Sequence, residues 1–74
     1  MTAVNSNKLK AKIVENGMNV SELAAKIGMD KSTLYRKIAN DGESMTVKDA
    51  NAIVRALNLT SADAIAIFFS QLVA

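Results

Sequence analysis

Apolar residues recur every three or four positions along almost the whole chain, and no segment alternates between apolar and polar residues. The first spacing is that of an amphipathic helix, whereas strict alternation is typical of a half-buried strand. Proline is absent, while alanine, leucine and lysine, which favour helices, are plentiful. The pattern therefore predicts an all-α chain.

Capping residues and glycines divide this pattern into five predicted helices. Gly17, Gly28 and the Asn40-Asp41-Gly42 cluster end the first three helices. Asp30 is the predicted N-cap of the third helix. Three pairs have the spacing of a capping box, in which two side chains accept from each other's backbone amides: Asn19 with Glu22, Thr46 with Asp49, and Thr60 with Asp63. The predicted helices cover residues 6–16, 19–28, 30–39, 46–57 and 61–72.

The first four predicted helices each have one apolar face, and these faces are expected to line a common core. Their predicted inner residues are, in chain order, Leu9, Ile13, Val14, Leu23, Ala24, Ile27, Leu34, Ile38, Val47, Ala50, Val54 and Leu57.

The last predicted helix is apolar on more than one face. Phe68 and Phe69 are adjacent, so their side chains point about 100° apart, and one small core does not easily hold both. A helix that is apolar all round is buried on all sides. This predicts a symmetric homodimer in which the helix packs against its copy, through Ile67, Phe68, Leu72 and Val73. The alternative is that the additional apolar surface folds back onto the first helix.

The connection between the second and third predicted helices is very short. Only Met29 and Asp30 follow Gly28 before the third helix begins. Two helices joined so closely meet at a steep angle. Ala24 is small enough for a close crossing and Leu34 can fill the angle, so the residues meet the mechanical needs of a helix-turn-helix.

The segment that carries these residues, NVSELAAKIGMDKSTLYRKI (residues 19–38), resembles the lambda-repressor-like, Cro/C1-type (XRE) helix-turn-helix regulators. The five-helix layout extends the resemblance over about residues 6–72. The resemblance implies a single lambda-repressor-like DNA-binding domain over residues 1–74. Its helix-turn-helix covers about residues 20–39, and its C-terminal helix, about 61–72, serves dimerisation. The family is common among phage and prophage repressors, small bacterial regulators and antitoxins.

Two positions depart from the family pattern. Val20 stands where the family often has a glutamine that braces a base-reading side chain. Lys37 stands where many relatives have an apolar residue, and the inner apolar residue of this sequence is Ile38.

Proteins of this kind place the N-terminal part of the third helix against base edges in the major groove, while the second helix crosses the backbone. With Leu34 and Ile38 turned inward, the predicted base-reading residues are Lys31, Ser32, Thr33, Tyr35 and Arg36. Arginine and lysine can donate to guanine O6 and N7. Helix N-termini and nearby hydrogen-bond donors bind phosphates of the DNA backbone. The residues predicted to make such contacts are Ser21, Lys37, Asn40, Ser44 and Lys10. The alternatives are a solvated helix face and, for Asn40 and Ser44, turn formation alone.

The charge distribution agrees with an anionic partner. The 74-residue chain has a net charge of +2, but residues 1–40 carry seven basic and three acidic side chains, a net +4, whereas residues 41–74 carry two basic and four acidic ones, a net −2. Such asymmetry favours an anionic partner for the N-terminal half, and the alternative is an ordinary surface that carries lysines.

Composition argues against catalysis and against a membrane. The chain has no cysteine and no histidine, so it lacks a thiol nucleophile, the usual general base and the commonest zinc ligands. Helix capping and a loop account for its acidic residues. The sequence predicts no enzyme, no metal or other cofactor and no small-molecule substrate. It has neither a signal-peptide pattern nor 18 consecutive apolar residues, which predicts a cytoplasmic protein without a membrane partner.

The favoured hypothesis is a sequence-specific transcriptional regulator, a repressor of phage or prophage type that binds a partly palindromic double-stranded DNA operator as a homodimer. A second regulatory protein could switch it. The alternative is a protein-interaction module of the same fold, like an antitoxin or anti-repressor, that acts through its apolar C-terminal helix.

Overall fold

The computed structural model describes residues 4–69, and this part contains helices but no strand. In chain order the helices are α1 (Ser6–Glu15), α2 (Val20–Ile27), α3 (Lys31–Ala39), α4 (Val47–Leu57) and α5 (Ser61–Phe68). The all-α prediction with five helices is therefore confirmed. The predicted extension of the last helix to residue 72 lies outside the described residues.

Two of the three predicted capping boxes form completely. Asn19 accepts from the Glu22 amide at 2.8 Å while the Glu22 carboxylate accepts from the Asn19 amide at 3.1 Å. Thr46 and Asp49 exchange the same pair of bonds at 3.0 Å each. These side chains use backbone donors that a helix N-terminus otherwise leaves unpaired, which fixes where α2 and α4 begin.

The third box forms only in part, because its acidic residue has another partner. Thr60 accepts from the Asp63 amide at 3.1 Å. The Asp63 carboxylate instead pairs with the Lys12 ammonium at 3.2 Å, which ties α5 to α1. The hydrogen bond from Lys12 lowers the pKa of Asp63, and the same bond raises the pKa of Lys12.

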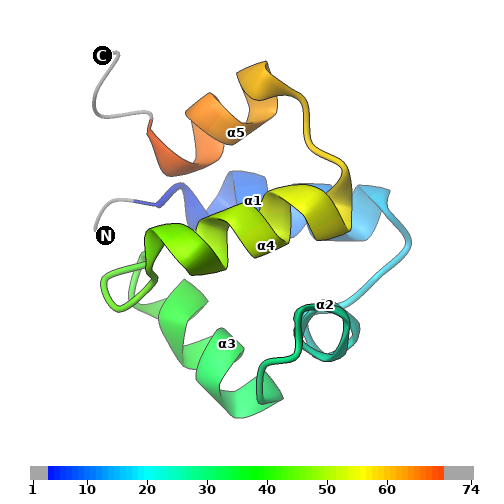
Figure 1. Cartoon of the computed structure of the whole chain (residues 1–74), viewed down its shortest axis with the longest axis vertical. Helices are drawn as coiled ribbons and strands as arrows, with labels where there is room; N and C mark the ends of the chain where they lie inside the picture. The colour runs from blue at the N-terminus through cyan, green and yellow to red at the C-terminus, as the bar shows by residue number, and fades with distance from the viewer. Residues whose placement is uncertain (1–3, 70–74) are drawn as a thin grey trace.

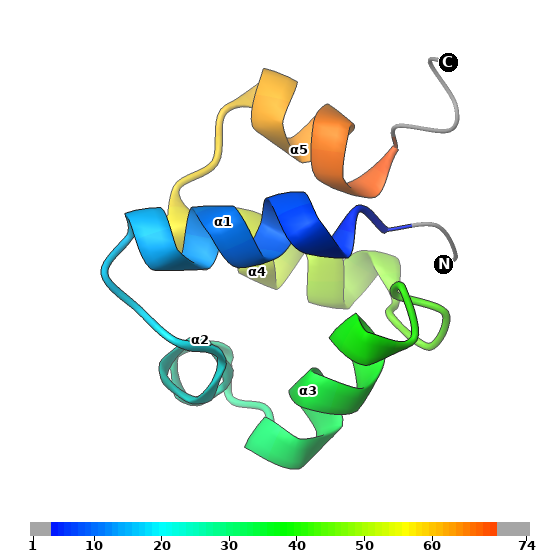
Figure 2. The ribbon, with the colours of Figure 1, turned by 180° about the vertical axis from the view of Figure 1, so that it is seen from behind.

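The helices are arranged in a small body of 32 × 22 × 19 Å. Figure 1 shows α1 and α4 crossing the middle, with α5 on one side of them and the α2–α3 pair at the opposite end; Figure 2 shows the same order from behind. Helix α5 packs on α1, and α2 packs on both α3 and α4. The predicted helix-turn-helix thus lies at the end of the molecule away from α5.

The core confirms most predicted inner residues and corrects two. Val14 is 72% exposed and Val47 is 62% exposed, so neither lies in the core. Val14 follows the buried Ile13, and the 100° turn between neighbouring helical residues points it to solvent. On α4 the buried face instead includes Ile53, at helical spacing from the adjacent core residues Ala50 and Leu57. The buried residues are Val4, Leu9, Ile13, Leu23, Ala24, Leu34, Ile38, Met45, Ala50, Ile53, Leu57, Ile67 and Phe68.

Candidate nucleic-acid interface

The turn between α2 and α3 is fixed by backbone and side-chain bonds. Gly28 closes α2 with a left-handed φ of +73°, and the next amide, that of Met29, donates to the Ala24 carbonyl at 2.9 Å. The Asp30 carboxylate then accepts from the amides of Ser32 and Thr33 at 3.0 and 3.4 Å, which starts α3. Because three residues complete both the closure and the new cap, α3 leaves α2 at a defined angle.

Packing between the two helices follows the predicted arrangement. Ala24 on α2 and Leu34 on α3 are both buried. The small side chain of Ala24 permits a close approach, and Leu34 fills the angle between the helices. Ile38, one turn further along α3, is buried as well, so α3 has a well-defined inner face.

The first turn and the exposed side of α3 carry the predicted base-reading residues. Lys31, Ser32 and Arg36 are exposed, Tyr35 is 51% exposed, and Thr33 is half-buried. At 100° per residue, positions 31, 32, 35 and 36 fall within an arc of about 140°, so they share one side of the helix. Within residues 4–69, Lys31 and Arg36 take part in no ion pair, so their charges remain available to a ligand.

The predicted backbone-contacting residues lie at several places. Ser21 is half-buried in the first turn of α2, while Asn40 and Ser44 are exposed on either side of the α3–α4 loop. Lys10 is exposed on α1, which packs against α2 and α5 and reaches the end of α3 where the Ser6 hydroxyl donates to the Ile38 carbonyl at 2.9 Å. Ser21, Asn40 and Ser44 therefore belong to the helices and loop that flank α3, whereas Lys10 is on a separate element.

Lys37 has an internal partner that the sequence did not indicate. Its ammonium donates to the Asp49 carboxylate at 2.6 Å, and both side chains are only 16% exposed. The long aliphatic part of a lysine can pack against apolar surface while its charged end reaches a polar group. This explains how a lysine is accommodated beside the buried Ile38, and it makes Lys37 a brace between α3 and α4.

The environment of Asp49 stabilises its charged form. Partial burial raises the pKa of this carboxyl, but hydrogen bonds from Lys37 and Thr46 outweigh the burial and hold the pKa below its usual value. Asp49 thereby caps α4 and pairs with α3 at the same time. The Lys37–Asp49 pair thus ties the last turn of α3 to the start of α4.

Side chains already occupy much of the anion-binding capacity of the helix N-termini. Asp30 takes two amides of α3, and Asn19 with Glu22 uses the amides at positions 19 and 22 of α2. No hydrogen bond within residues 4–69 uses the backbone amides of Val20 and Ser21. An anion at the start of α2 would therefore meet these two amides and the Ser21 hydroxyl.

Helix α5 buries two of the predicted dimer residues in the core of its own chain. Ile67 and Phe68 are buried, which agrees in part with the alternative that α5 folds back onto α1. The apolar side chains that α5 leaves accessible are Ile65, 43% exposed, and Phe69, 38% exposed, four positions apart on one face. Leu72 and Val73 lie outside the described residues.

The described part of the chain offers neither a metal site nor a membrane span. Across residues 4–69 there is no group of three or more histidine, cysteine, aspartate or glutamate residues that could hold a metal ion. None of the helices described is both long enough and apolar enough to span a bilayer.

Comparison with known proteins gives one match. A family model described as "Cro/C1-type HTH DNA-binding domain", where HTH stands for helix-turn-helix, matches residues 8–69. The matched range runs from the first turns of α1 to the residue after α5 and contains the whole α2–α3 unit. No curated protein sequence and no solved structure gives a significant match.

Proposed function

The chain belongs to the family of Cro/C1-type HTH DNA-binding domains, and from this premise we propose that it is a sequence-specific transcriptional repressor of phage or prophage type. Membership supports a DNA-binding regulator. The observation that carries the more specific proposal is the exposed polar face of α3, where two cations that form no ion pair within residues 4–69 stand beside hydroxyl groups.

Sequence reading is assigned to the side chains of this face. Arg36 can donate two hydrogen bonds to O6 and N7 of one guanine, and Lys31 can reach the same acceptors on another. Ser32 can bond to several bases, and the methyl group of Thr33 can contact a thymine methyl. Tyr35 can contact a base edge or a phosphate. Major-groove edges differ for all four base pairs, so such contacts discriminate between sequences.

Contacts to the DNA phosphates are assigned the role of orienting the protein on the duplex. Ser21 and the open amides of α2 can hold one phosphate, and Asn40 and Ser44 can hold others beyond the end of α3. Lys10 adds charge from α1. Lys37 enters the proposal differently, because its charge is neutralised by Asp49. We assign it the role of fixing α3 on α4 rather than that of a phosphate contact.

The proposed operator is partly palindromic, and the protein binds it as a homodimer. The long dimension of one chain is 32 Å, close to the spacing of about 34 Å between half-sites one DNA turn apart. Ile65 and Phe69 offer an apolar contact on α5, at the end away from α2 and α3. Leu72 and Val73 remain part of this proposed interface. Repression would follow if the bound dimer blocks polymerase.

Selection of bound sequences from a random duplex library, at low and at moderate salt, tests the proposal. The expected result is a partly palindromic consensus with half-sites about one turn apart. Affinity should fall steeply as salt rises, because binding releases counterions from several phosphates. Salt-sensitive binding without any enriched sequence would contradict sequence-specific recognition.

The alternative function is a protein-interaction module that acts through α5, and the exposure of Ile65 and Phe69 is the observation in its favour. An apolar protein contact should respond only weakly to salt. A library selection that enriches nothing would favour this alternative and direct the search to a protein that covers α5.

A further inference from the structure

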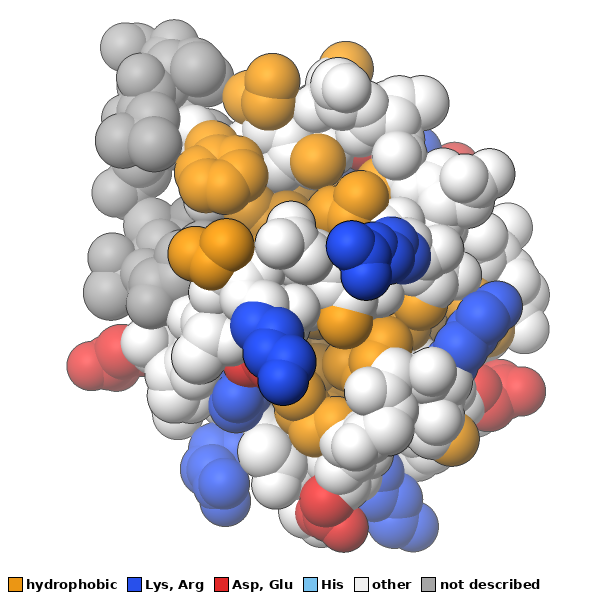
Figure 3. Space-filling model, in the orientation of Figure 1, with side chains coloured by type: hydrophobic (Ala, Val, Ile, Leu, Met, Phe, Trp, Pro, Cys, Tyr) orange, Lys and Arg blue, Asp and Glu red, His pale blue; other side chains and the backbone are white. Residues whose placement is uncertain are grey.

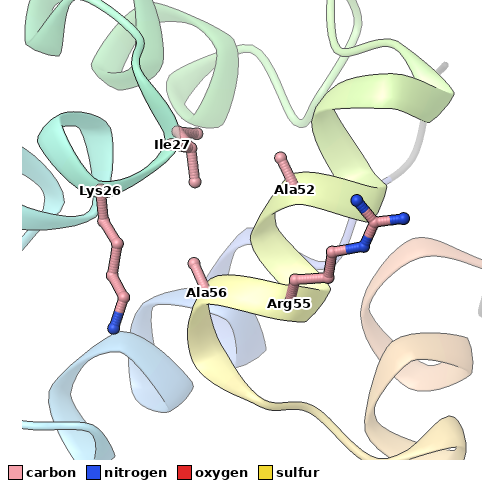
Figure 4. A pocket seen from close by; sticks show the side chains of 5 residues that line it. All are labelled: Lys26, Ile27, Ala52, Arg55 and Ala56. Carbon is pink, nitrogen blue, oxygen red and sulfur yellow. The ribbon is translucent and has the colours of Figure 1, made fainter.

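A shallow groove lies between the C-terminal turn of α2 and the second half of α4. It has a volume of about 370 Å³ and is open to solvent. Figure 4 shows Ile27 and two alanines pointing toward the space between the helices, while Lys26 and Arg55 extend away at its two sides. The residues that line it are Lys26 and Ile27 from α2, and Ala52, Arg55 and Ala56 from α4.

The floor of the groove suits a helix better than a small molecule. Pockets for small ligands enclose most of the ligand surface, which an open groove cannot do. Ala52 and Ala56 are four residues apart and thus adjacent on one face of α4. Their small side chains allow another helix to approach closely, at the 8–10 Å that is typical between the axes of packed helices. An amphipathic helix laid into an apolar groove is a common mode of peptide recognition.

The sides of the groove are positively charged. Lys26 and Arg55 are exposed, and neither forms an ion pair within residues 4–69. No acidic residue lines the groove. Figure 3 shows apolar surface between basic side chains on this face of the molecule. A helix with acidic residues on both sides of its apolar stripe would match this pattern, and a basic one would be repelled.

The groove is separate from the face assigned to DNA. Lys26 follows Ser21 by five residues on α2, which places it about 7.5 Å further along the axis and about 140° around it. Arg55 is in the last turn of α4, whereas the Lys37–Asp49 pair joins α3 to the first turn of that helix. The residues that line the groove are therefore not among those assigned to DNA contacts.

We propose that this groove is a docking site for an acidic amphipathic helix of a partner protein. The partner's apolar stripe covers Ile27, Ala52 and Ala56, and its carboxylates pair with Lys26 and Arg55. The inference does not require that the chain binds DNA, so binding of the partner helix is measured without DNA and a separate DNA measurement checks that the groove is not part of the DNA surface.

The test is a titration of the isotopically labelled full chain with a synthetic helical peptide, followed by amide chemical shifts. The peptide carries leucines four residues apart and glutamates on both sides of them; a second peptide carries lysines in place of the glutamates. The acidic peptide should shift the amides of residues 26–27 and 52–56 and reach saturation. The double substitution Lys26→Glu with Arg55→Glu should weaken its binding at least about tenfold.

Lys10→Glu is the matched control, because Lys10 is an exposed cation on α1 that does not line the groove. It should change affinity by less than about twofold. Equal binding of both peptides, shifts confined to other residues, or no saturable shift would overturn the proposal. It would also be overturned if Lys26→Glu with Arg55→Glu reduced affinity for duplex DNA as much as Lys31→Glu, because the groove would then belong to the DNA surface.

Discussion

Gly42 occupies a position where a side chain has no room. It is buried in the α3–α4 loop with a φ of +75°, and the place that a Cβ would take is filled by the side chain of Val4. The Val4 amide donates to the Asp41 carbonyl at 2.8 Å, which holds the two segments together. A single glycine thus lets the N-terminal segment pack against the end of α3.

Gly42→Ala should therefore destabilise the fold by about 2–4 kcal/mol, from a strained left-handed conformation together with overpacking against Val4. Urea unfolding followed by circular dichroism measures the loss. Gly17→Ala is the control, because Gly17 has a similar φ of +71° but no atom within 4 Å of the added Cβ. It should cost about 1–2 kcal/mol. Equal losses in the two variants would show that the Val4 contact is unimportant.

Arg36 is the residue to which the proposed function assigns most sequence discrimination. Arg36→Ala should cost about 1–3 kcal/mol in binding to the selected operator and relax the base preference at one position. Arg55→Ala removes the same side chain from the last turn of α4 and should leave DNA affinity unchanged. Fluorescence anisotropy with the operator and single-base variants measures both. Unchanged binding by the Arg36 variant would mean that another face of the protein contacts DNA.

Helix boundaries were predictable from the sequence because their determinants are local. The capping pairs at the starts of α2 and α4 span only three residues, so their spacing is visible in the chain. The ion pairs could not be predicted in this way. Lys37 on α3 pairs with Asp49 on α4, and Lys12 on α1 pairs with Asp63 on α5. Such contacts depend on how the helices pack, which no short-range pattern contains.

The Lys37–Asp49 brace should make stability depend on acidic pH. A carboxyl whose pKa is lower in the folded than in the unfolded chain, where it is about 3.9, stabilises the fold above that value. This contribution is lost as the pH falls through the folded-state pKa. Asp49→Asn should therefore reduce stability by about 1–2 kcal/mol at pH 7 and flatten its decline toward pH 3. Urea midpoints at both pH values measure this.

Glu43→Gln is the control for the change of charge, since Glu43 is exposed and has no ion pair among the described residues. It should alter stability by less than about 0.5 kcal/mol. Lys37→Met should flatten the acid profile in the same direction but less than Asp49→Asn, because it removes the Lys37 bond that lowers the pKa of Asp49 and leaves the bonds with Thr46. A Lys37 variant with the acid profile of the parent protein would contradict the assigned brace.

For the whole molecule, the exposed face of α3 was easier to predict than the accessible face of α5. On α3 the polar and apolar sides are distinct, so the burial of Leu34 and Ile38 identifies the exposed side. On α5 several faces are apolar, and its rotation is fixed by contacts distant in sequence. These include the Asn5 amide, which donates to the Ile67 carbonyl at 2.7 Å, and the Lys12–Asp63 pair. The rotation turns Ile67 inward and leaves Ile65 accessible.

Ile65→Lys tests whether α5 joins two chains, because Ile65 is accessible in one chain but would be buried in the proposed dimer. A lysine at the centre of an apolar contact should raise the dimer dissociation constant at least about tenfold, measured by sedimentation at micromolar concentration. Val14→Lys places the same charge on α1, where Val14 is highly exposed, and should leave the dimer intact. Thermal unfolding of both variants checks that the fold persists.

A parent protein that stays monomeric with and without operator DNA would contradict the dimer, whereas equal weakening by both substitutions would place the contact on α1 as well. If only Ile65→Lys weakens the dimer, it should also lower affinity for the palindromic operator more than for a single half-site, because only the full operator requires two joined chains.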